Sequence, residues 1–590
     1  MSGTIFVIRH VAELAIFASA AFFWGRLAGR ALPFRDGFEQ AVVSCALGVG
    51  VLASLLNLLG LAGAITQPGV AAVIGAPILA RLLAPGLFER LPLSVDRAAR
   101  IGLVALLPTV LLSLALALYP PTAFDATLYH LPIAKAFARQ HGIVFLPDLR
   151  FPVFPQLFEM LYAGALTLSD DVTAQLLHVF ALAVVSAGLI AWGRRFATGR
   201  AGLWAAAAWL GNPLALVMAG VAMVDVGLAL FCTFAVYAWE AARDTGDARW
   251  LTASAAFAGL AASTKYLGLF FVAALAAATV FTGRPGGRFR RAARFLAAAV
   301  IVLLPFYWRI VSWTGNPVFP YLSSWFGVSP WSQWLDPLPA SAARTGWHGA
   351  TLPGAALWEG PILSPLALLL LPFLVWWATK DRLARFVLAL SLAYLACWCL
   401  ASPDKRFLLA IVPACSAGAA SGLDAFFRRW TGAGRPARAG LAAALALLLC
   451  SPGAAWTARL LHRRGPLPVT ARERDAYLTR FLPVYPALQI LNRSLGSRYA
   501  VYVLFRENAA YFADGRFLGD HFGPNRFSRV TEELSDPQRL LGLLRGMGVT
   551  HLLVDRTSES GQKMLLEPLA TTFYPMPSPP GTALFALPPP

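Results

Sequence analysis

Long apolar runs return throughout residues 1–456 of this chain. They lie at about 5–24, 40–60, 68–84, 101–119, 172–192, 201–219, 225–241, 250–263, 266–282, 295–312, 362–378, 384–400, 407–424 and 439–456. A helix that crosses a bilayer needs about 20 mostly apolar residues. Only 13% of this chain is charged, whereas a soluble domain is about 25% charged. The sequence therefore predicts a polytopic α-helical membrane protein with roughly 12–14 spans, several of them short.

Arginines divide the connections between these runs into two kinds. Basic clusters occupy every second connection: Arg26, Arg30 and Arg35; Arg81, Arg90, Arg97 and Arg100; Arg194, Arg195 and Arg200; Arg243 and Arg249; the stretch 284–294; Lys380, Arg382 and Arg385; and the stretch 428–438. Cytoplasmic loops are enriched in arginine and lysine. The alternation therefore predicts that 119–171, 313–361 and everything after 457 lie outside the cytoplasm. It also accounts for the net charge of +19 without nucleic acid as a partner.

The last part of the chain, 457–590, has a different composition from the rest. Short buried strands are predicted at 499–505, 550–555 and 582–587, and a helix at 535–548 with Ser535 as its cap. We expect a small extracytoplasmic α/β domain here, after a transmembrane domain at 1–456. No GxGxxG or P-loop pattern occurs in it, so a nucleotide site is not indicated.

The outer connection 119–171 is the first candidate for chemistry. Asp125 lies soon after an apolar run, where a carboxylate can act as a general base toward a hydroxyl, or else cap a helix. His130 and Tyr129 can contact a substrate or satisfy the loop, and Arg150 is a further candidate for substrate binding. Glu159 is expected on an amphipathic segment that rests on the membrane surface.

Isolated charges also stand at the outer ends of later apolar runs. Asp225 and Lys265 lie next to hydrocarbon, where ionisable groups usually face a cavity and mark function; the alternative is a structural ion pair. Lys405 and Arg406 are on the same predicted side and can hold a lipid phosphate, or else reach for the interface. All these residues are candidates for substrate binding.

No metal or disulfide is predicted. The six cysteines all fall in apolar runs, and the eight histidines show no metal-ligand spacing.

Several short motifs occur in a fixed order along the chain. They are an acid at 125, YHLP at 129–132, VD at 224–225, TKY at 264–266, GNPVFP at 315–320 and KRFLL at 405–409. Over residues 101–590 this set resembles the GT-C superfamily of integral-membrane glycosyltransferases, and within it the bacterial protein mannosyltransferase/aminoarabinose transferase-like group.

The resemblance implies transfer of a sugar from a polyprenyl-phosphate-linked donor to a lipid, polysaccharide or protein acceptor. The site would face the periplasm from the bacterial inner membrane. The family's catalytic acid maps onto Asp125, its donor-phosphate contacts onto Lys265 and Arg406, and Asp225 would line the cavity. No cofactor is implied, because the lipid-phosphate sugar is itself a substrate.

Two features depart from the family's pattern. About three spans precede the region that resembles its first helix, and Ala126 stands where relatives often have a second acid, so no metal is expected. The alternative class is a multispan transporter or lipid flippase, which would place ionisable residues near the bilayer midplane and show internal repeats. A polysaccharide polymerase or ligase would share the chemistry.

Overall fold

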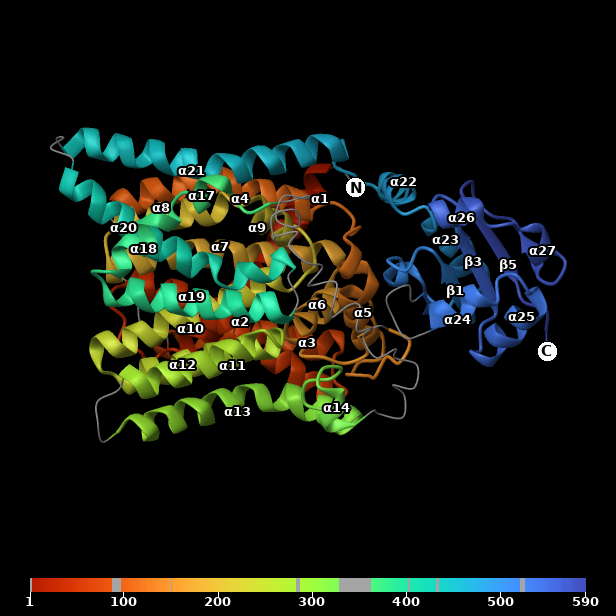
Figure 1. Ribbon diagram of the computed structural model, residues 1–590, viewed down its shortest axis with the longest axis horizontal. Helices are drawn as coiled ribbons and strands as arrows, with labels where there is room; N and C mark the ends of the chain where they lie inside the picture. Colours follow the sequence, from red (N-terminus) through yellow and green to blue (C-terminus); the bar gives the residue numbers. More distant parts are fainter. Residues whose placement is uncertain are drawn as a thin grey trace.

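The structure is a bundle of helices with a smaller α/β domain at one end (Figure 1). This computed structural model describes residues 3–87, 97–149, 151–282, 287–327, 362–401, 404–430, 435–519 and 526–589. The helices before the α/β domain are α1 (Gly3–Ala28), α2 (Gly37–Leu61), α3 (Gln67–Leu83), η1 (Pro85–Leu87), α4 (Arg97–Ala117), η2 (Ala126–His130), α5 (Leu131–Arg139), α6 (Leu157–Leu168), α7 (Asp171–Phe196), α8 (Gly199–Leu210), α9 (Pro213–Ala219), α10 (Asp225–Thr245), α11 (Ala248–Thr264), α12 (Gly268–Thr282), α13 (Arg288–Thr314), α14 (Ser323–Phe326), α17 (Pro365–Leu368), α18 (Leu371–Ala378), α19 (Arg382–Ala401), η5 (Lys405–Ala410), α20 (Val412–Trp430) and α21 (Arg435–Arg464).

The apolar runs form helices as expected. Within the described ranges, seven helices are long and apolar enough to cross a membrane, judged by length and composition: α1, α2, α7, α10, α13, α19 and α21. An eighth span is formed if α8 and α9, which meet at 71°, are counted together. Shorter apolar helices fill most of the remaining runs, α3 and α12 among them. The prediction of a polytopic α-helical membrane protein is confirmed.

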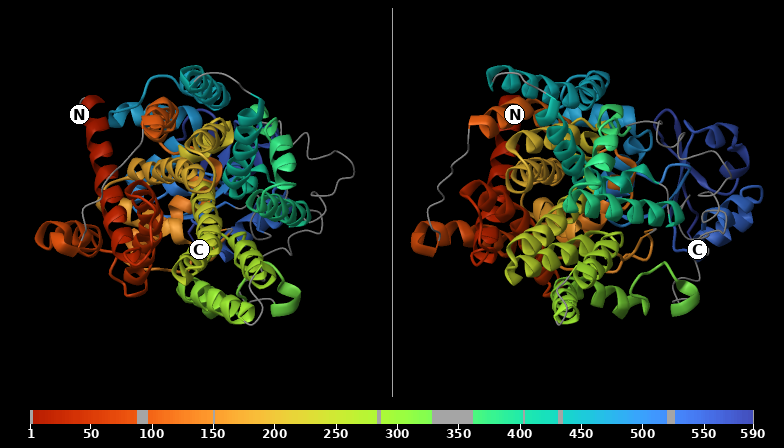
Figure 2. Two further views of the ribbon diagram at one scale, coloured as in Figure 1. Left: turned by 90° about the vertical axis from the view of Figure 1, so that its left-hand side faces the viewer. Right: turned by 60° about the vertical axis from the view of Figure 1, so that its left-hand side comes forward.

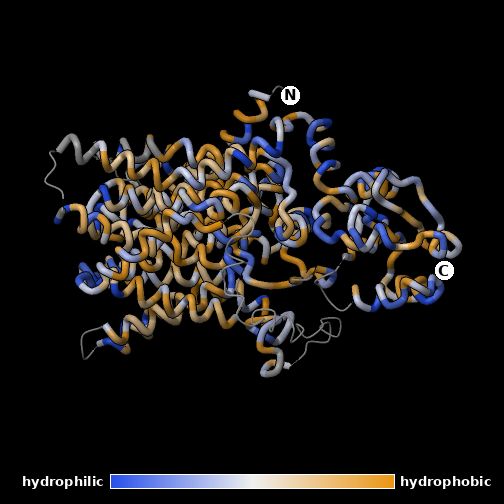
Figure 3. The backbone as a smooth tube through the Cα atoms, turned by 45° about the horizontal axis from the view of Figure 1, so that its top comes forward, coloured by the Kyte–Doolittle hydropathy of each residue, from blue (hydrophilic) through white to orange (hydrophobic). Residues whose placement is uncertain are grey.

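Helices differ in how much of their surface the protein covers. α10 lies in the middle of the bundle and is buried along nearly its whole length, and α7 is mostly buried. α1, α13 and α21 run along the outside (Figures 1 and 2) and expose apolar side chains such as Ile8, Ile301 and Leu447. Hydrophobic residues dominate the bundle, whereas hydrophilic ones gather at its ends and in the C-terminal domain (Figure 3). An apolar exterior of this kind is suited to lipid.

The run at 201–219 is broken at Gly211-Asn212, between α8 and α9. The Asn212 amide nitrogen donates to the carbonyl of Ala208 at 2.6 Å. Its amide oxygen accepts the backbone N–H of Ser364 at 2.7 Å, and the Leu214 N–H donates to the Ile362 carbonyl at 3.2 Å. Backbone groups that the break leaves unpaired are thereby satisfied, as a bilayer interior demands.

The C-terminal domain is built on a five-stranded sheet in the order β2-β1-β3-β5-β4. β1 pairs in parallel with β2 and β3, while β5 pairs antiparallel with β3 and β4. Its elements are α22 (Ala471–Phe481), α23 (Tyr485–Leu495), β1 (Ala500–Leu504), η6 (Ala510–Phe512), β2 (Arg516–Leu518), α24 (Arg526–Glu532), α25 (Pro537–Gly546), β3 (His551–Asp555), α26 (Glu559–Lys563), α27 (Glu567–Ala570), β4 (Tyr574–Met576) and β5 (Thr582–Ala586). The predicted small α/β domain is confirmed.

Two details of that prediction need correction. α21 continues to Arg464, past the expected boundary at 456, because its polar last turns extend beyond the apolar run. The cap of α25 is Asp536 and not Ser535: the Asp536 carboxylate accepts the backbone N–H groups of Gln538 and Arg539, both at 3.1 Å.

The domain is tied to the connection 119–171 by charged contacts. Arg516 donates to the Asp148 carboxylate at 2.6 and 2.9 Å, and Arg526 donates to it at 3.1 Å. Lys135 on α5 donates to the backbone carbonyls of Tyr511 and Ala513 at 2.8 and 2.9 Å. The domain and this connection therefore lie at the same end of the bundle.

Candidate active site

Asp125 lies at the start of η2, a single π-helical turn that leads into α5. Its side chain makes no capping hydrogen bond to that turn, so the helix-cap alternative is not realised. Instead its carboxylate accepts a hydrogen bond from Nη1 of Arg406 at 2.7 Å. π-helical turns occur often at functional sites. The turn directs this carboxylate toward Arg406, which lies 281 positions later in the sequence.

Arg406, at the start of η5, joins two acids. Its Nε and Nη2 donate to the Asp404 carboxylate at 2.9 and 2.7 Å, while Nη1 holds Asp125. The Arg406 side chain is 24% exposed and that of Asp125 is 18% exposed. Arg406 is therefore not simply extended toward the membrane–water interface, which was the alternative for this residue. Its neighbour Lys405 makes no ion pair with any residue that the structure describes.

Asp225 and Lys265 form the ion pair that the sequence left as an alternative. Lys265 Nζ lies 3.0 Å from Asp225 Oδ1. The same Nζ lies 4.0 Å from the centre of the Phe407 ring, and the Arg406 guanidinium lies 5.9 Å from that ring centre. Two cations and three carboxylates thus converge around Phe407. The structure brings together Asp125, Asp225, Lys265 and Arg406, and their roles in substrate binding and catalysis stay a prediction.

His178 fixes the turn that presents Asp225, and sequence reasoning missed it. Its Nε2 accepts the backbone N–H groups of Val226 and Gly227 at 3.1 and 3.2 Å, so Nδ1 carries the proton. Nδ1 donates to the carbonyls of Met218 and Val221 at 2.9 and 3.0 Å. A histidine inside the apolar run at 172–192 was the available signal.

His130 and Glu159 form a buried pair beside Asp125. His130 Nδ1 lies 2.5 Å from Glu159 Oε1, and both side chains are almost fully covered. The expected position of Glu159 on the membrane surface is wrong. α6 packs against α2, α5 and α7, so the protein encloses all its faces and the carboxylate needs internal partners.

Tyr129 and Arg150 are the remaining substrate-binding candidates in the same connection. The Tyr129 ring lies 4.2 Å from the His130 ring and 5.2 Å from that of Phe151, centre to centre. Arg150 lies outside the described residues, as does most of the 313–361 connection.

Arg309 is a buried cation that the sequence reasoning did not select. It lies in α13, where Nη2 donates to the Phe154 carbonyl at 3.4 Å and Nη1 to Asn57 Oδ1 at 3.5 Å. Glu159 attracts it electrostatically. A lone arginine in the apolar run at 295–312 is the pattern that marks such a residue.

The charges determine the ionisation of the loop acid. Burial raises the pKa of Asp125, but Arg406, with smaller contributions from His130 and Lys265, outweighs it and holds the pKa below its usual value. The Asp125 carboxylate is therefore ionised at neutral pH. Burial, with Asp125 nearby, raises the pKa of the Tyr129 phenol well above its usual value, so Tyr129 stays protonated.

A metal site does not emerge from the geometry. Among the described residues, no three His, Cys, Asp or Glu side chains gather closely enough to hold an ion. The expectation that no metal is needed stays a prediction.

Comparisons with known proteins add to this geometry. The sequence profile of the dolichyl-phosphate-mannose-protein mannosyltransferase family matches residues 155–311. A profile described as SF2091/S2213 matches residues 473–575. An uncharacterised protein of Shigella flexneri, SF2093/S2215, is 41% identical over 70 residues, which is 12% of this chain and only 35% of that protein.

Two solved structures share the fold. ArnT from Cupriavidus metallidurans bound to undecaprenyl phosphate superposes with a TM-score of 0.52 and 16% identity, covering 82% of this chain and 96% of ArnT. The oligosaccharyltransferase AglB from Archaeoglobus fulgidus, in complex with an inhibitory peptide and a dolichol-phosphate, gives 0.51 and 12%, covering 82% and 74%. Together with the mannosyltransferase profile, these likenesses confirm the expected resemblance: this chain is a multi-pass membrane protein with the fold of the GT-C glycosyltransferases.

Proposed function

We propose that this protein transfers a sugar from a polyprenyl-phosphate-linked donor to a hydroxyl group of an acceptor. The observation that carries the proposal is the contact between Asp125 and Arg406, next to Lys265 on the same Phe407 ring. An ionised carboxylate beside two cations provides both a base and a phosphate site. Arginine and lysine bind phosphate oxygens with strong charge-assisted hydrogen bonds.

Each group would have a definite role in the reaction. Arg406 and Lys265 bind the donor phosphate, which draws Arg406 away from Asp125 and frees that carboxylate. Asp125 then accepts the proton of the acceptor hydroxyl as its oxygen forms a bond to the anomeric carbon. The bond between that carbon and the phosphate oxygen breaks, and the lipid phosphate leaves with the electron pair. The two cations stabilise the negative charge that develops on the leaving phosphate.

Surrounding residues would keep this arrangement in place. Asp225 orients Lys265 through their ion pair, and His178 holds the turn that carries Asp225. His130, fixed by Glu159, and Tyr129 form the wall next to Asp125 and would contact the sugar. Lys405 would add a further positive charge near the phosphate.

The reaction would take place on the periplasmic face of the inner membrane. The arginine clusters are expected in the cytoplasm, and two of them meet at one end of the bundle: Arg194 pairs with Asp36 at 2.8 Å, and Arg195 pairs with Glu39. Asp125 and the C-terminal domain belong to the other set of connections, those without arginine clusters, which are expected outside the cytoplasm. The acceptor is a lipid, a polysaccharide or a protein, and the donor lipid enters from the membrane.

Donor binding by the purified protein tests this proposal. In liposomes, Lys265→Ala and Arg406→Ala should each weaken binding of a radiolabelled polyprenyl phosphate sugar by at least about tenfold, since each removes a phosphate contact. Arg194→Ala, which removes an arginine from a carboxylate pair elsewhere, is the matched control. Unchanged donor binding in both variants would refute the phosphate site. Movement of labelled lipid across the bilayer without sugar transfer would favour the flippase alternative.

A further inference from the structure

A cavity lies between the helical bundle and the C-terminal domain. It has a volume of about 950 Å³ and is lined on one side by α5 and the ends of α3, α6 and α7, and on the other by α22, α23 and η6. Asp125, Asp225, Lys265 and Arg406 are not part of its lining. The cavity is therefore distinct from the candidate active site.

The connection 119–171 joins the two sites. Asp125 precedes η2, and Lys135, ten positions later on α5, lines the cavity; this separation is roughly 15 Å at 1.5 Å per helical residue. Thr127 Oγ1 donates to the Asn508 carbonyl at 2.7 Å, so the domain also contacts the turn next to Asp125. The C-terminal domain therefore contacts both the cavity lining and the turn beside Asp125.

The cavity lining holds three cations and four carboxylates, with Asp170 and Asp475 in addition to the pairs that follow. Lys135 and Arg139 both pair with Asp514, at 3.2 and 2.6 Å, and Arg474 pairs with Asp171 at 2.8 Å. Each cation of the lining therefore already has a carboxylate partner. Because the carboxylates are in excess, this lining favours a neutral ligand over an anion.

Hydrogen-bonding groups and aromatic rings line the remaining surface. The side chains of Gln67 and Gln489 form no hydrogen bond with any residue that the structure describes, which leaves both amides available to a ligand. The Phe512 ring meets the rings of Tyr485 and Tyr511, each at 5.2 Å between centres. Amide groups that donate and accept, next to aromatic faces, suit sugar rings, which present hydroxyl edges and apolar C–H faces.

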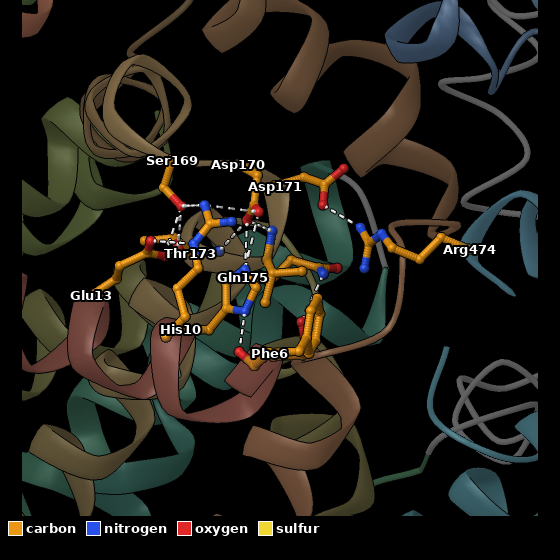
Figure 4. A network of polar contacts seen from close by, with 12 residues as sticks. Phe6, His10, Glu13, Ser169, Asp170, Asp171, Thr173, Gln175 and Arg474 are labelled. Carbon is orange, nitrogen blue, oxygen red and sulfur yellow. Dashed lines mark hydrogen bonds and ion pairs between the residues drawn. The ribbon is translucent and has the colours of Figure 1, made fainter. Parts of the chain in front are cut away.

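Side chains of α1 form hydrogen bonds with residues of one cavity wall. Figure 4 shows His10 of α1 against Asp170, with Nε2 at 3.0 and 3.1 Å from the carboxylate oxygens. Glu13 accepts the hydroxyl groups of Ser169 and Thr173 at 2.7 and 2.6 Å. Ser169 and Asp170 both line the cavity. The first span, which precedes the region of family resemblance, thus fixes part of this surface in place.

We propose that this cavity binds a neutral glycan segment of the acceptor and holds the acceptor's end close to Asp125. The inference rests on the proposed function for the meaning of "acceptor", but the binding itself does not depend on catalysis. It gives the C-terminal domain and the first span a shared role, because the domain forms one wall of the cavity and α1 holds Ser169 and Asp170 of the other.

Binding of labelled oligosaccharides to the full-length protein tests this inference. The probe is a series of short neutral oligosaccharides, released from the cell envelope of the source bacterium, added to protein in nanodiscs without donor. Gln489→Ala should weaken their binding at least about tenfold, and Gln489→Trp, which fills the cavity, should abolish it. Ser494→Trp changes an exposed residue on the same helix and should bind like the unmodified protein.

The outcomes separate this inference from the proposed function. Donor binding by the Gln489 variants should be unchanged, which also shows that they are folded. Oligosaccharide binding that requires Gln489, in a protein that transfers no sugar, would support the cavity and refute the function. The cavity assignment is overturned if the unmodified protein binds none of the oligosaccharides, if Gln489→Trp binds them normally, or if only inorganic phosphate or a serine-rich peptide competes at the site.

Discussion

Replacing Asp125 with asparagine isolates its function as a base. The amide oxygen of Asn still accepts the hydrogen bond from Arg406, and Arg406 keeps both of its contacts to Asp404. What Asn cannot do is take a proton. The substitution therefore removes proton acceptance while leaving the shape of the site nearly intact.

The expected size of the effect follows from this geometry. Loss of general-base catalysis typically lowers a rate by 10²–10⁴-fold, which corresponds to about 2.7–5.4 kcal/mol at 1.36 kcal/mol per tenfold. The free energy of unfolding should fall by only about 1 kcal/mol, because Arg406 retains a carboxylate partner. Asp125→Asn should thus fold and bind donor, yet transfer sugar at least about a hundredfold more slowly.

The pH profile provides a second check on the same residue. The pKa of Asp125 is held below its usual value of 3.8. The carboxylate therefore stays ionised as the pH falls from 8 to about 5, and is protonated only in more acidic solution. Protonation of Asp125 should produce no loss of kcat/KM in the unmodified protein over that interval, because kcat/KM reports the ionisation of the donor-free protein, in which Arg406 contacts Asp125.

The assay is transfer from a radiolabelled polyprenyl phosphate sugar by purified protein in liposomes. Asp36→Asn is the matched control, because Asp36 forms an arginine pair of similar length, 2.8 Å, with Arg194. If Asp125→Asn transfers sugar within about threefold of the unmodified rate, the general-base reasoning is refuted. A large loss in Asp148→Asn without one in Asp125→Asn would mean that the wrong acid was chosen.

Three further predictions concern other parts of the chain. Asp148→Asn should keep near-normal transfer but loosen the C-terminal domain by about 1 kcal/mol, because it weakens two arginine contacts; faster hydrogen exchange in β2 would reveal this. Burial and the nearby Arg139 lower the pKa of Lys135 to about 8, whereas Asp514 raises it, so Asp514→Asn should shift the midpoint for competitive amine labelling of Lys135 below that value. A reporter that is active only in the cytoplasm should be silent when fused after residue 590, and a strong signal would overturn the predicted sidedness.

Sequence reasoning located the charged residues of the site because hydrocarbon makes isolated charges conspicuous. Asp225 and Lys265 each stand alone at the end of an apolar run, so their shared position could be inferred from the parity of the spans. The same argument from the parity of the spans placed Arg406 on that side of the membrane. Their convergence on the Phe407 ring could not be inferred, since it depends on how α10 packs against η5 and α12.

Residues with partners on distant helices were harder to assign. The segment around Glu159 predicts a surface position because its pattern is amphipathic, but that pattern does not reveal whether another helix covers the polar side. His178 and Arg309 were missed although each stands inside an apolar run, because the sequence does not show their partners, which are mainly backbone groups. Tertiary packing decides such cases.

The break between α8 and α9 has a consequence for the order in which the protein is assembled. At this break the Leu214 N–H donates to the Ile362 carbonyl, and the Asn212 side-chain oxygen accepts the Ser364 N–H; both partners are synthesised about 150 residues after Asn212. A Cβ atom at Gly211 would lie 1.9 Å from the Leu449 carbonyl oxygen, so α21 also closes tightly over this point. Until those segments have been inserted, the Leu214 N–H and the Asn212 amide oxygen lack these partners in the bilayer. The early spans are therefore less stable in the membrane until the later segment is inserted. A chain that stops before residue 362 should be a substrate for membrane quality-control proteases.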